Sequence, residues 1–451
     1  MRKQRKQVLK RVRKGARLQM VMAVIFVFSL VACEGLPFDL DIPWLMPGSG
    51  TPTITPTPET VGPTADPSAE VESTPAPPPE SLTIWIPPEF DPDGDSQAAN
   101  LLKTQLQAFS DNNDGITINL RVKDASGPGG LLDALTATSA AAPAALPDLI
   151  ALQRTDLEAA ALKSLVYPLD DLTSITDDTD WYPYARDMAL IQGSVFGVPF
   201  AGDALALIYQ TSKVDSTPST WEGLFEALQV VAFPADDPQA YFTLVLYQAA
   251  GGAVQDNQRR PVLDAEPLTE VFKLYQSGVA SGDFSNLLLE YQTENQVWQA
   301  YQEGLADGAV VSVSRFLQEN PADTSMIPML PVSDITLSMG SGWVWALATP
   351  QAERQALSIK LAEHLVDSAF LSEWNYEINT MPPRPSALEG WEDQSLRSLL
   401  SQISVMTVLR PSNDIIASLG PILRDAVIQI LQEQVDPAQA AQVAQESLQK
   451  P

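Results

Sequence analysis

Residues 195–209 read Val-Phe-Gly-Val-Pro-Phe-Ala-Gly-Asp-Ala-Leu-Ala-Leu-Ile-Tyr, and this stretch decides the fold. Two apolar runs typical of buried strands lie on either side of a break at Pro199 and the small residues after it. Asp203 is the only charged residue in the stretch. Because a lone carboxylate among apolar residues needs a polar partner, the pattern predicts a strand that crosses between two lobes, with Asp203 facing the cleft. The alternative is a buried strand pair joined by a turn, in which the Asp only accepts backbone N–H groups.

Length and charge narrow the class of protein. A chain of 451 residues is too long for one hydrophobic core and predicts two or three domains, and an apolar fraction of 45% is enough to fill them. The chain has 27 Lys and Arg against 56 Asp and Glu. Nine of the basic residues precede residue 18, so 18 remain after Cys33 and the net charge there is −38. A surface this acidic repels phosphate backbones, which excludes nucleic acid as a partner.

The first 33 residues have the pattern of an export signal. Residues 2–17 are strongly basic, and residues 20–32 form an apolar run that is too short to span a membrane comfortably. The run ends in Leu30-Val31-Ala32-Cys33, which resembles the bacterial lipobox and implies lipidation of Cys33 at the outer face of the cytoplasmic membrane. A Cys buried in an uncleaved signal anchor is the alternative. Because Cys33 is the only Cys, no intramolecular disulfide can form.

Residues 34–80 are expected to form a disordered tether. Twelve Pro, many Thr and Ser, and no Lys or Arg occur in residues 36–80, a composition that cannot bury enough apolar surface to fold. At ~3.1 Å per residue in a polyproline II conformation, such a segment reaches on the order of 100 Å.

The remaining chain, from residue 81, alternates strand and helix patterns. Strands are expected at 82–86, 116–122 and 148–152, with helices at 101–109, 131–142 and 157–165. This order predicts a parallel α/β sheet, with ligands beyond the carboxyl ends of its strands. The second half predicts helices at 221–230, 241–250, 268–277 and 295–303, a strand at 309–313, and long helices at 351–368 and about 413–435.

Several short motifs in this body together resemble one family. They are Trp85 in the opening strand, Pro147-Asp-Leu-Ile150, Tyr167-Pro-Leu-Asp170, Gly197-Val-Pro-Phe200 with Asp203 and Tyr209, Thr220-Trp221-Glu222, Ala249-Ala-Gly-Gly252, Gly304, Gly342-Trp-Val-Trp345 and Met381-Pro-Pro-Arg384. In this order and spacing they resemble the extracellular solute-binding proteins of ABC importers, of the sugar- and maltose-binding type.

The resemblance implies a two-lobed α/β fold of the periplasmic-binding-protein type II, with a hinge crossed near 199–204 and 329–338. The expected lobes are residues 81–200 with about 333–375, and residues 201–332 with about 376–451. The resemblance implies a monomer that closes on a small solute, a sugar or oligosaccharide, and presents it to a permease; neither catalysis nor a cofactor is implied.

Five residues at matching positions are candidate ligand contacts. Asp203 stands where relatives place a carboxylate that accepts hydrogen bonds from ligand hydroxyls. Trp343 and Trp345, two apart on a strand, share a face and could stack on sugar rings, or pack in the core. Tyr241 resembles the aromatic contact of the second lobe, with core packing as its alternative. Arg315 replaces an aromatic residue of relatives, which implies a polar or anionic ligand or an ion pair with Asp203.

Three further residues complete the candidate site. Glu89 and Arg154 follow first-lobe strands, and Arg384 either borders the cleft or lies on the surface. With one His and one Cys, the chain cannot assemble a transition-metal cluster or a His-based triad. Two other functions remain open at this point, a receptor for a membrane sensor and a secreted carbohydrate-active enzyme.

Overall fold

The computed structural model describes residues 81–449. The predicted signal segment, Cys33 and the predicted tether lie outside the described residues. Within residues 81–449 there is no helix whose length and apolar character would let it cross a membrane.

The first three strands form a parallel sheet, as the sequence predicts. They are β1 (Ser81–Ile86), β2 (Thr117–Val122) and β3 (Leu149–Gln153), with β1 between the other two. The connecting helices are α2 (Gln97–Asp111) and α3 (Leu131–Ala141), and α4 (Arg154–Leu162) follows β3. β1 and β3 are almost fully buried, which explains their continuous apolar sequences.

Residues 197–209 of the stretch 195–209 lie in one long strand, β6 (Gly197–Gln210). Residues 197–204 pair antiparallel with β10 (Ser338–Leu347), and residues 205–210 pair with β8 (Gly308–Ser312) and β9 (Thr324–Ile327). The predicted break at Pro199 is wrong. The strand continues because the register against β10 shifts between Trp343 and Val344, at the point where Pro199 has no N–H to donate.

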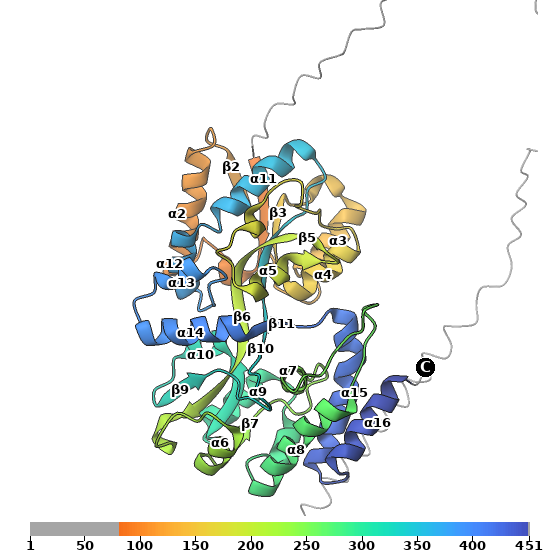
Figure 1. The fold of residues 1–451 in the computed structure, drawn as a ribbon. Helices are drawn as coiled ribbons and strands as arrows, with labels where there is room; N and C mark the ends of the chain where they lie inside the picture. Colours follow the sequence, from red (N-terminus) through yellow and green to blue (C-terminus); the bar gives the residue numbers. More distant parts are fainter. Residues whose placement is uncertain (1–80, 450–451) are drawn as a thin grey trace, which may run out of the picture. The chain divides into compact units, whose positions relative to one another are not determined.

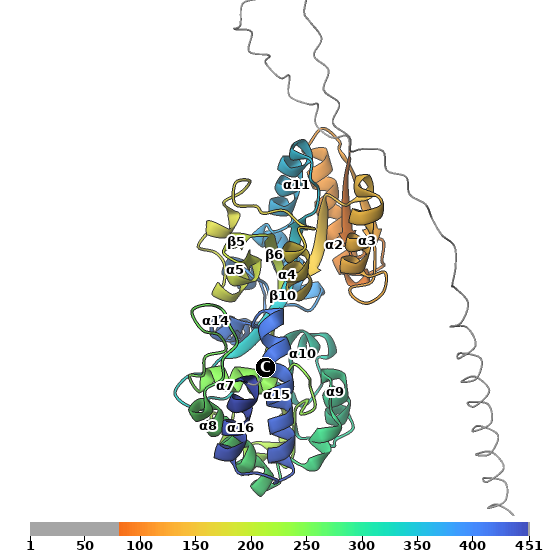
Figure 2. The same ribbon diagram turned by 90° about the vertical axis from the view of Figure 1, so that its right-hand side faces the viewer.

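β6 therefore joins two parts of one sheet, whose order is β2-β1-β3-β10-β6-β8-β7, with β7 at Val231–Ala232. β11 (Thr407–Leu409) pairs with β10, and β9 pairs with β6. A separate two-stranded sheet contains β4 (Leu190–Ile191) and β5 (Ser194–Val195). Figures 1 and 2 show two groups of elements joined through β6, β10 and the chain that enters α15. We call the group with β1–β3 the first lobe and the group with β7–β9 the second lobe.

The second lobe is mostly helical around β7–β9. Its helices are α6 (Trp221–Ala227), α7 (Tyr241–Ala249), α8 (Ala265–Ser281), α9 (Glu294–Gln302), α10 (Val313–Glu319), α15 (Asn413–Leu431) and α16 (Pro437–Gln449). The Thr220 side chain caps α6 by accepting from Gly223 N, as the sequence allowed. Phe233, Phe242, Tyr275 and Phe284 contact one another in an aromatic core.

Residues 352–406 form four helices, of which the sequence predicted only the first. They are α11 (Ala352–His364), α12 (Ser368–Glu377), α13 (Pro385–Glu389) and α14 (Gln394–Met406). α12 packs on α2 and α13, and α14 packs on α5 (Pro183–Ala189) and β6. α12 and α14 thus contact elements that precede the crossing, and α14 also contacts the crossing strand β6.

α5 contacts the crossing strand closely at Gly202. A Cβ at this position would lie 2.0 Å from Tyr184 Oη, so no larger residue fits. Gly202 also exchanges two backbone hydrogen bonds with Met381, at 2.8 and 2.9 Å. The backbone immediately before Asp203 is therefore held on two sides.

Candidate functional site

A cavity of about 490 Å³ lies beside the crossing strands. Its volume is within the range of roughly 300–1,000 Å³ typical of small-molecule sites. Both lobes and the strands between them contribute to the wall, which includes Gln153, Thr155, Asp203, Gln239, Tyr241, Glu294, Ser312, Ser314, Trp343, Thr380 and Arg410. A second cavity of about 430 Å³ in the second lobe shares Leu205, Gln239, Tyr241 and Glu294 with the first.

Asp203 lies in the wall of the larger cavity, where the sequence placed it, and it also accepts backbone N–H groups, as the alternative stated. Its Oδ1 accepts from Ser314 N at 3.0 Å and from its neighbour Ala204 N at 2.8 Å, while Oδ2 accepts from the Ser314 hydroxyl. Ser314 is in the first turn of α10, so the carboxylate is also close to a helix N-terminus. Burial, with a smaller contribution from the charge of Glu294, raises the pKa of Asp203 to about 6, although these hydrogen bonds lower it.

The two tryptophans have different environments. Trp343 is partly buried, lines the cavity and contacts Phe90 edge to face at 5.2 Å. Trp345 is 1% exposed and stacks on Phe200 at 4.5 Å, inside the first-lobe core. They belong to one aromatic row through Phe90 and Phe200, but only Trp343 reaches the cavity.

Tyr241 lines both cavities from the start of α7. Its hydroxyl accepts a hydrogen bond of 2.9 Å from Arg410 Nε. Arg410 follows β11, is 7% exposed and also lines the larger cavity. The sequence analysis missed Arg410 because the residue lies in an unremarkable Leu-Arg-Pro segment, far along the chain from the other wall residues.

Arg315 does not pair with Asp203, so that expectation is wrong. Its guanidinium lies 3.5 Å from Glu294 Oε1 and 3.7 Å from Glu319 Oε1, and it hydrogen-bonds Asn295. Arg315 is not a wall residue of the cavity, whereas Glu294, which sequence reasoning did not single out, is one. The Ser312 hydroxyl donates to Glu294 Oε1 at 2.9 Å and helps to fix this carboxylate.

Arg154 joins α4 to the start of α15. Its Nη1 lies 3.2 Å from Glu158 Oε2, and Glu158 Oε1 accepts from Asn413 N at 2.9 Å. Asn413 Oδ1 accepts from Arg410 Nη1 at 2.9 Å. A chain of polar contacts therefore leads from buried Arg154 to the cavity wall, although Arg154 itself does not line the cavity.

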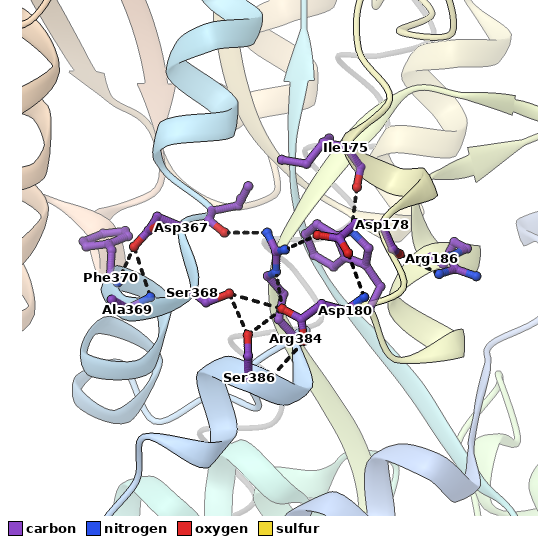
Figure 3. A network of polar contacts seen from close by, with 12 residues as sticks. Ile175, Asp178, Asp180, Arg186, Asp367, Ser368, Ala369, Phe370, Arg384 and Ser386 are labelled. Atoms are coloured by element: carbon purple, nitrogen blue, oxygen red, sulfur yellow. Dashed lines mark hydrogen bonds and ion pairs between the residues drawn. The ribbon is translucent and has the colours of Figure 1, made fainter.

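Arg384 is held in a network of ion pairs and hydrogen bonds within the first lobe, which Figure 3 shows. It is 9% exposed, and its Nη2 and Nε pair with Asp178 and Asp180 at 2.6 and 2.9 Å. Its guanidinium lies over the Trp181 ring, 4.7 Å from the centroid. Neither Arg384 nor the exposed Glu89 is a wall residue of the cavity.

The fold and the cavity together define a two-lobed binding protein, and comparisons identify its family. The profile of the bacterial extracellular solute-binding proteins matches residues 104–396, about two thirds of the chain. The chain belongs to this family, which places it outside the cytoplasm.

One relative is named for the solute that it binds. The maltotriose-binding protein of Pyrococcus abyssi is 31% identical over 121 residues, which are 25% of this chain and 26% of that protein. The aligned part therefore spans only about a quarter of the relative's length.

Solved structures show the same fold at low sequence identity. A cyclo/maltodextrin-binding protein complexed with maltotetraose matches with a TM-score of 0.67 and 18% identity, over 84% of this chain and 98% of that chain. UgpB from Mycobacterium tuberculosis in complex with glycerophosphocholine matches with a TM-score of 0.59 and 17% identity, over 82% and 97%. These likenesses establish the two-lobed fold predicted from the sequence.

Proposed function

We propose that this chain captures a sugar or oligosaccharide in the cavity between its lobes and delivers it to the permease of an ABC importer. Membership of the solute-binding family and the named maltotriose- and maltodextrin-binding relatives support this function. We infer a binding protein without catalytic activity, because its relatives are binding proteins.

The observation that carries the proposal is the composition of the cavity wall. Trp343 from β10 and Tyr241 from α7 supply aromatic surface from opposite lobes, which suits the C–H faces of sugar rings. Asp203 and Glu294 supply carboxylates that can accept hydrogen bonds from ligand hydroxyls. A hydrogen bond to a charged group of this kind contributes roughly 1.5–3 kcal/mol. Gln153, Thr155 and Gln239 add neutral donors and acceptors that suit hydroxyl groups.

Closure of the lobes on the solute follows from this arrangement. The lobes are connected by β6, by the segment that leads into β10, and by residues 410–412 before α15. A ligand that touches Trp343 and Tyr241 at once gains contacts in the closed form that the open form lacks, and only this difference shifts the equilibrium.

We propose lobe boundaries that differ slightly from the expectation drawn from the resemblance. The packing of α12–α14 on α2, α5 and each other supports placing residues up to about 406 in the first lobe. The second lobe then comprises residues 205–337 and those from about 410 onward. We further propose a monomer that is anchored through lipid on Cys33 and held away from the membrane by residues 34–80.

A thermal-shift screen with neutral mono- and oligosaccharides, followed by calorimetric titration, tests the proposal. Binding to the folded state raises the melting temperature by an amount set by the ratio of ligand concentration to Kd. Tyr241→Phe should weaken saccharide binding because Tyr241 is in the cavity wall. Tyr247→Phe is the matched control on the same helix, since its hydroxyl bonds Ala253 O and Asp264 N in the core.

The control variant should lose stability and keep affinity. No shift with any saccharide, or equal affinity loss in both Tyr variants, would contradict the proposed site.

A further inference from the structure

The cavity contains a buried positive charge that has no carboxylate partner. Three arginines among residues 81–449 are less than a tenth exposed, namely Arg154, Arg384 and Arg410. Arg154 pairs with Glu158, and Arg384 pairs with Asp178 and Asp180. Within the same described part of the chain, no acidic oxygen lies within 4.0 Å of the Arg410 guanidinium.

The partners of Arg410 are neutral. Its Nε donates to the Tyr241 hydroxyl and its Nη1 donates to Asn413 Oδ1, both at 2.9 Å. Burial raises the pKa of Tyr241, so this hydroxyl remains protonated at neutral pH. Among the described residues, Nη2 of Arg410 has no hydrogen-bond acceptor, while the residue itself lines the cavity.

The group of charges behind Arg410 carries a net positive charge. Arg154, Glu158 and Arg410 are connected through Asn413, so this group contains two guanidinium groups and only one carboxylate, which pairs with Arg154. Burial lowers the pKa of Arg154 most; Glu158 opposes this effect, and the positive charge of Arg410 adds to it. A buried charge without a counter-charge is costly, and an anion beside it removes much of that cost.

The carboxylates that line the two cavities have hydrogen-bond partners other than Arg410. Both oxygens of Asp203 accept hydrogen bonds from Ala204 or Ser314, and Glu294 accepts from Ser312 and Arg315. Asp237, in the adjoining cavity, accepts from the backbone of Gln239 and Tyr241. The cavity walls therefore carry these carboxylates on the crossing strand and in the second lobe, while Arg410 adds a positive charge that none of them neutralises.

We propose that the ligand is a saccharide or polyol with an anionic group, a carboxylate or a phosphate, that binds Arg410, while its hydroxyls reach Asp203 and Glu294. This inference rests on the proposed function and adds the charge of the ligand to it. The planar guanidinium suits either anion because carboxylate and phosphate oxygens match the spacing of its N–H groups. A neutral maltodextrin leaves Arg410 without a counter-charge.

Calorimetric titration of the whole mature chain with sugars that differ in charge tests whether an anionic group of the ligand binds Arg410. Glucuronate and glucose 6-phosphate represent the carboxylate and the phosphate, glucose is their neutral counterpart, and inorganic phosphate is the anion alone. We expect one of the two anionic sugars to bind more tightly than glucose. Arg410→Gln should weaken the binding of that anionic sugar by roughly 10- to 100-fold, and it should weaken any glucose binding by a clearly smaller factor.

Two variants control for folding and for general charge. Arg410→Lys keeps the charge without the planar donors, so we expect an intermediate loss. Arg424→Gln removes an arginine paired with Asp425 on the second lobe, and we expect no change in affinity. Circular dichroism shows whether each variant is folded.

The outcomes separate this inference from the proposed function. If glucose or a neutral oligosaccharide binds as tightly as the anionic sugars, the inference of an anionic ligand is wrong, whereas the proposed saccharide-binding function is retained. A second outcome is that inorganic phosphate binds the wild type and not Arg410→Gln while no sugar binds either protein. That result would support an anion site at Arg410 and contradict the proposed saccharide-binding function. Equal binding of an anionic sugar to wild type and Arg410→Gln overturns the inference.

Discussion

Replacing Asp203 by Asn should make the protein more stable at neutral pH and lower its affinity for ligand. The carboxylate is buried, and its pKa is raised from 3.8 to about 6. Because the folded-state pKa is above the unfolded value, the fold favours the protonated form. Stability associated with Asp203 is therefore fully present below the unfolded pKa and is lost as the pH rises through the folded pKa.

The size of this effect follows from the two pKa values. A shift of roughly two units at 1.36 kcal/mol per unit gives about 3 kcal/mol of lost stability once Asp203 is ionised. Most of this loss develops between pH 4 and pH 6. An amide keeps an oxygen for Ser314 N and Ala204 N but does not titrate, so Asp203→Asn escapes the loss.

Thermal and urea unfolding of wild type and Asp203→Asn at pH 4, 5, 6 and 7 measure the difference directly. All other acids titrate in both proteins, so the difference isolates Asp203. The stability of the variant relative to wild type should rise with pH by about 2–3 kcal/mol and level off above pH 6. A difference that stays constant across this range, or a variant that loses stability as the pH rises, would refute the reasoning.

Four further substitutions separate effects on binding from effects on stability. Glu158→Gln leaves Arg154 without its counter-charge, and urea unfolding should show a loss of about 3–5 kcal/mol, whereas a loss below 1 kcal/mol would mean that the pair is not effectively buried. Trp345→Ala should cost about 3–5 kcal/mol of stability through the cavity it leaves, while Trp343→Ala should mainly weaken saccharide binding in titration; the reverse pattern would exchange their roles. Arg384→Met leaves two carboxylates unpaired, so the melting temperature should fall with affinity unchanged, and a selective loss of affinity would return Arg384 to the site.

Much of the fold could be predicted because its signals are local. The buried strands β1 and β3 are short apolar runs bounded by turn residues, and Thr220 marks the start of α6. Pro199 misled the prediction because its effect depends on the partner strand. The register shift in β10 accommodates the missing N–H, and nothing in residues 195–209 reveals that shift.

The site was only partly predictable because its members meet through tertiary structure. The lone charge singled out Asp203, the spacing of two tryptophans on one strand singled out Trp343, and the resemblance to the family singled out Tyr241. All three line the cavity. Burial of Trp345 could not be read from alternation, which gives it the same face as Trp343. Arg410 could not be found because its importance lies in the missing counter-charge, which is a property of the assembled neighbourhood rather than of any short segment.

The distance between the lobes, measured with and without ligand, tests the central claim most directly. Spin labels at Leu162→Cys and Leu305→Cys, both exposed and one on each lobe, can be compared in a Cys33→Ser background. The ligand is whichever saccharide raises the melting temperature of the unlabelled protein. Closure predicts a shorter and narrower distance distribution at saturation, and an unchanged distribution with calorimetrically confirmed binding would contradict capture between moving lobes.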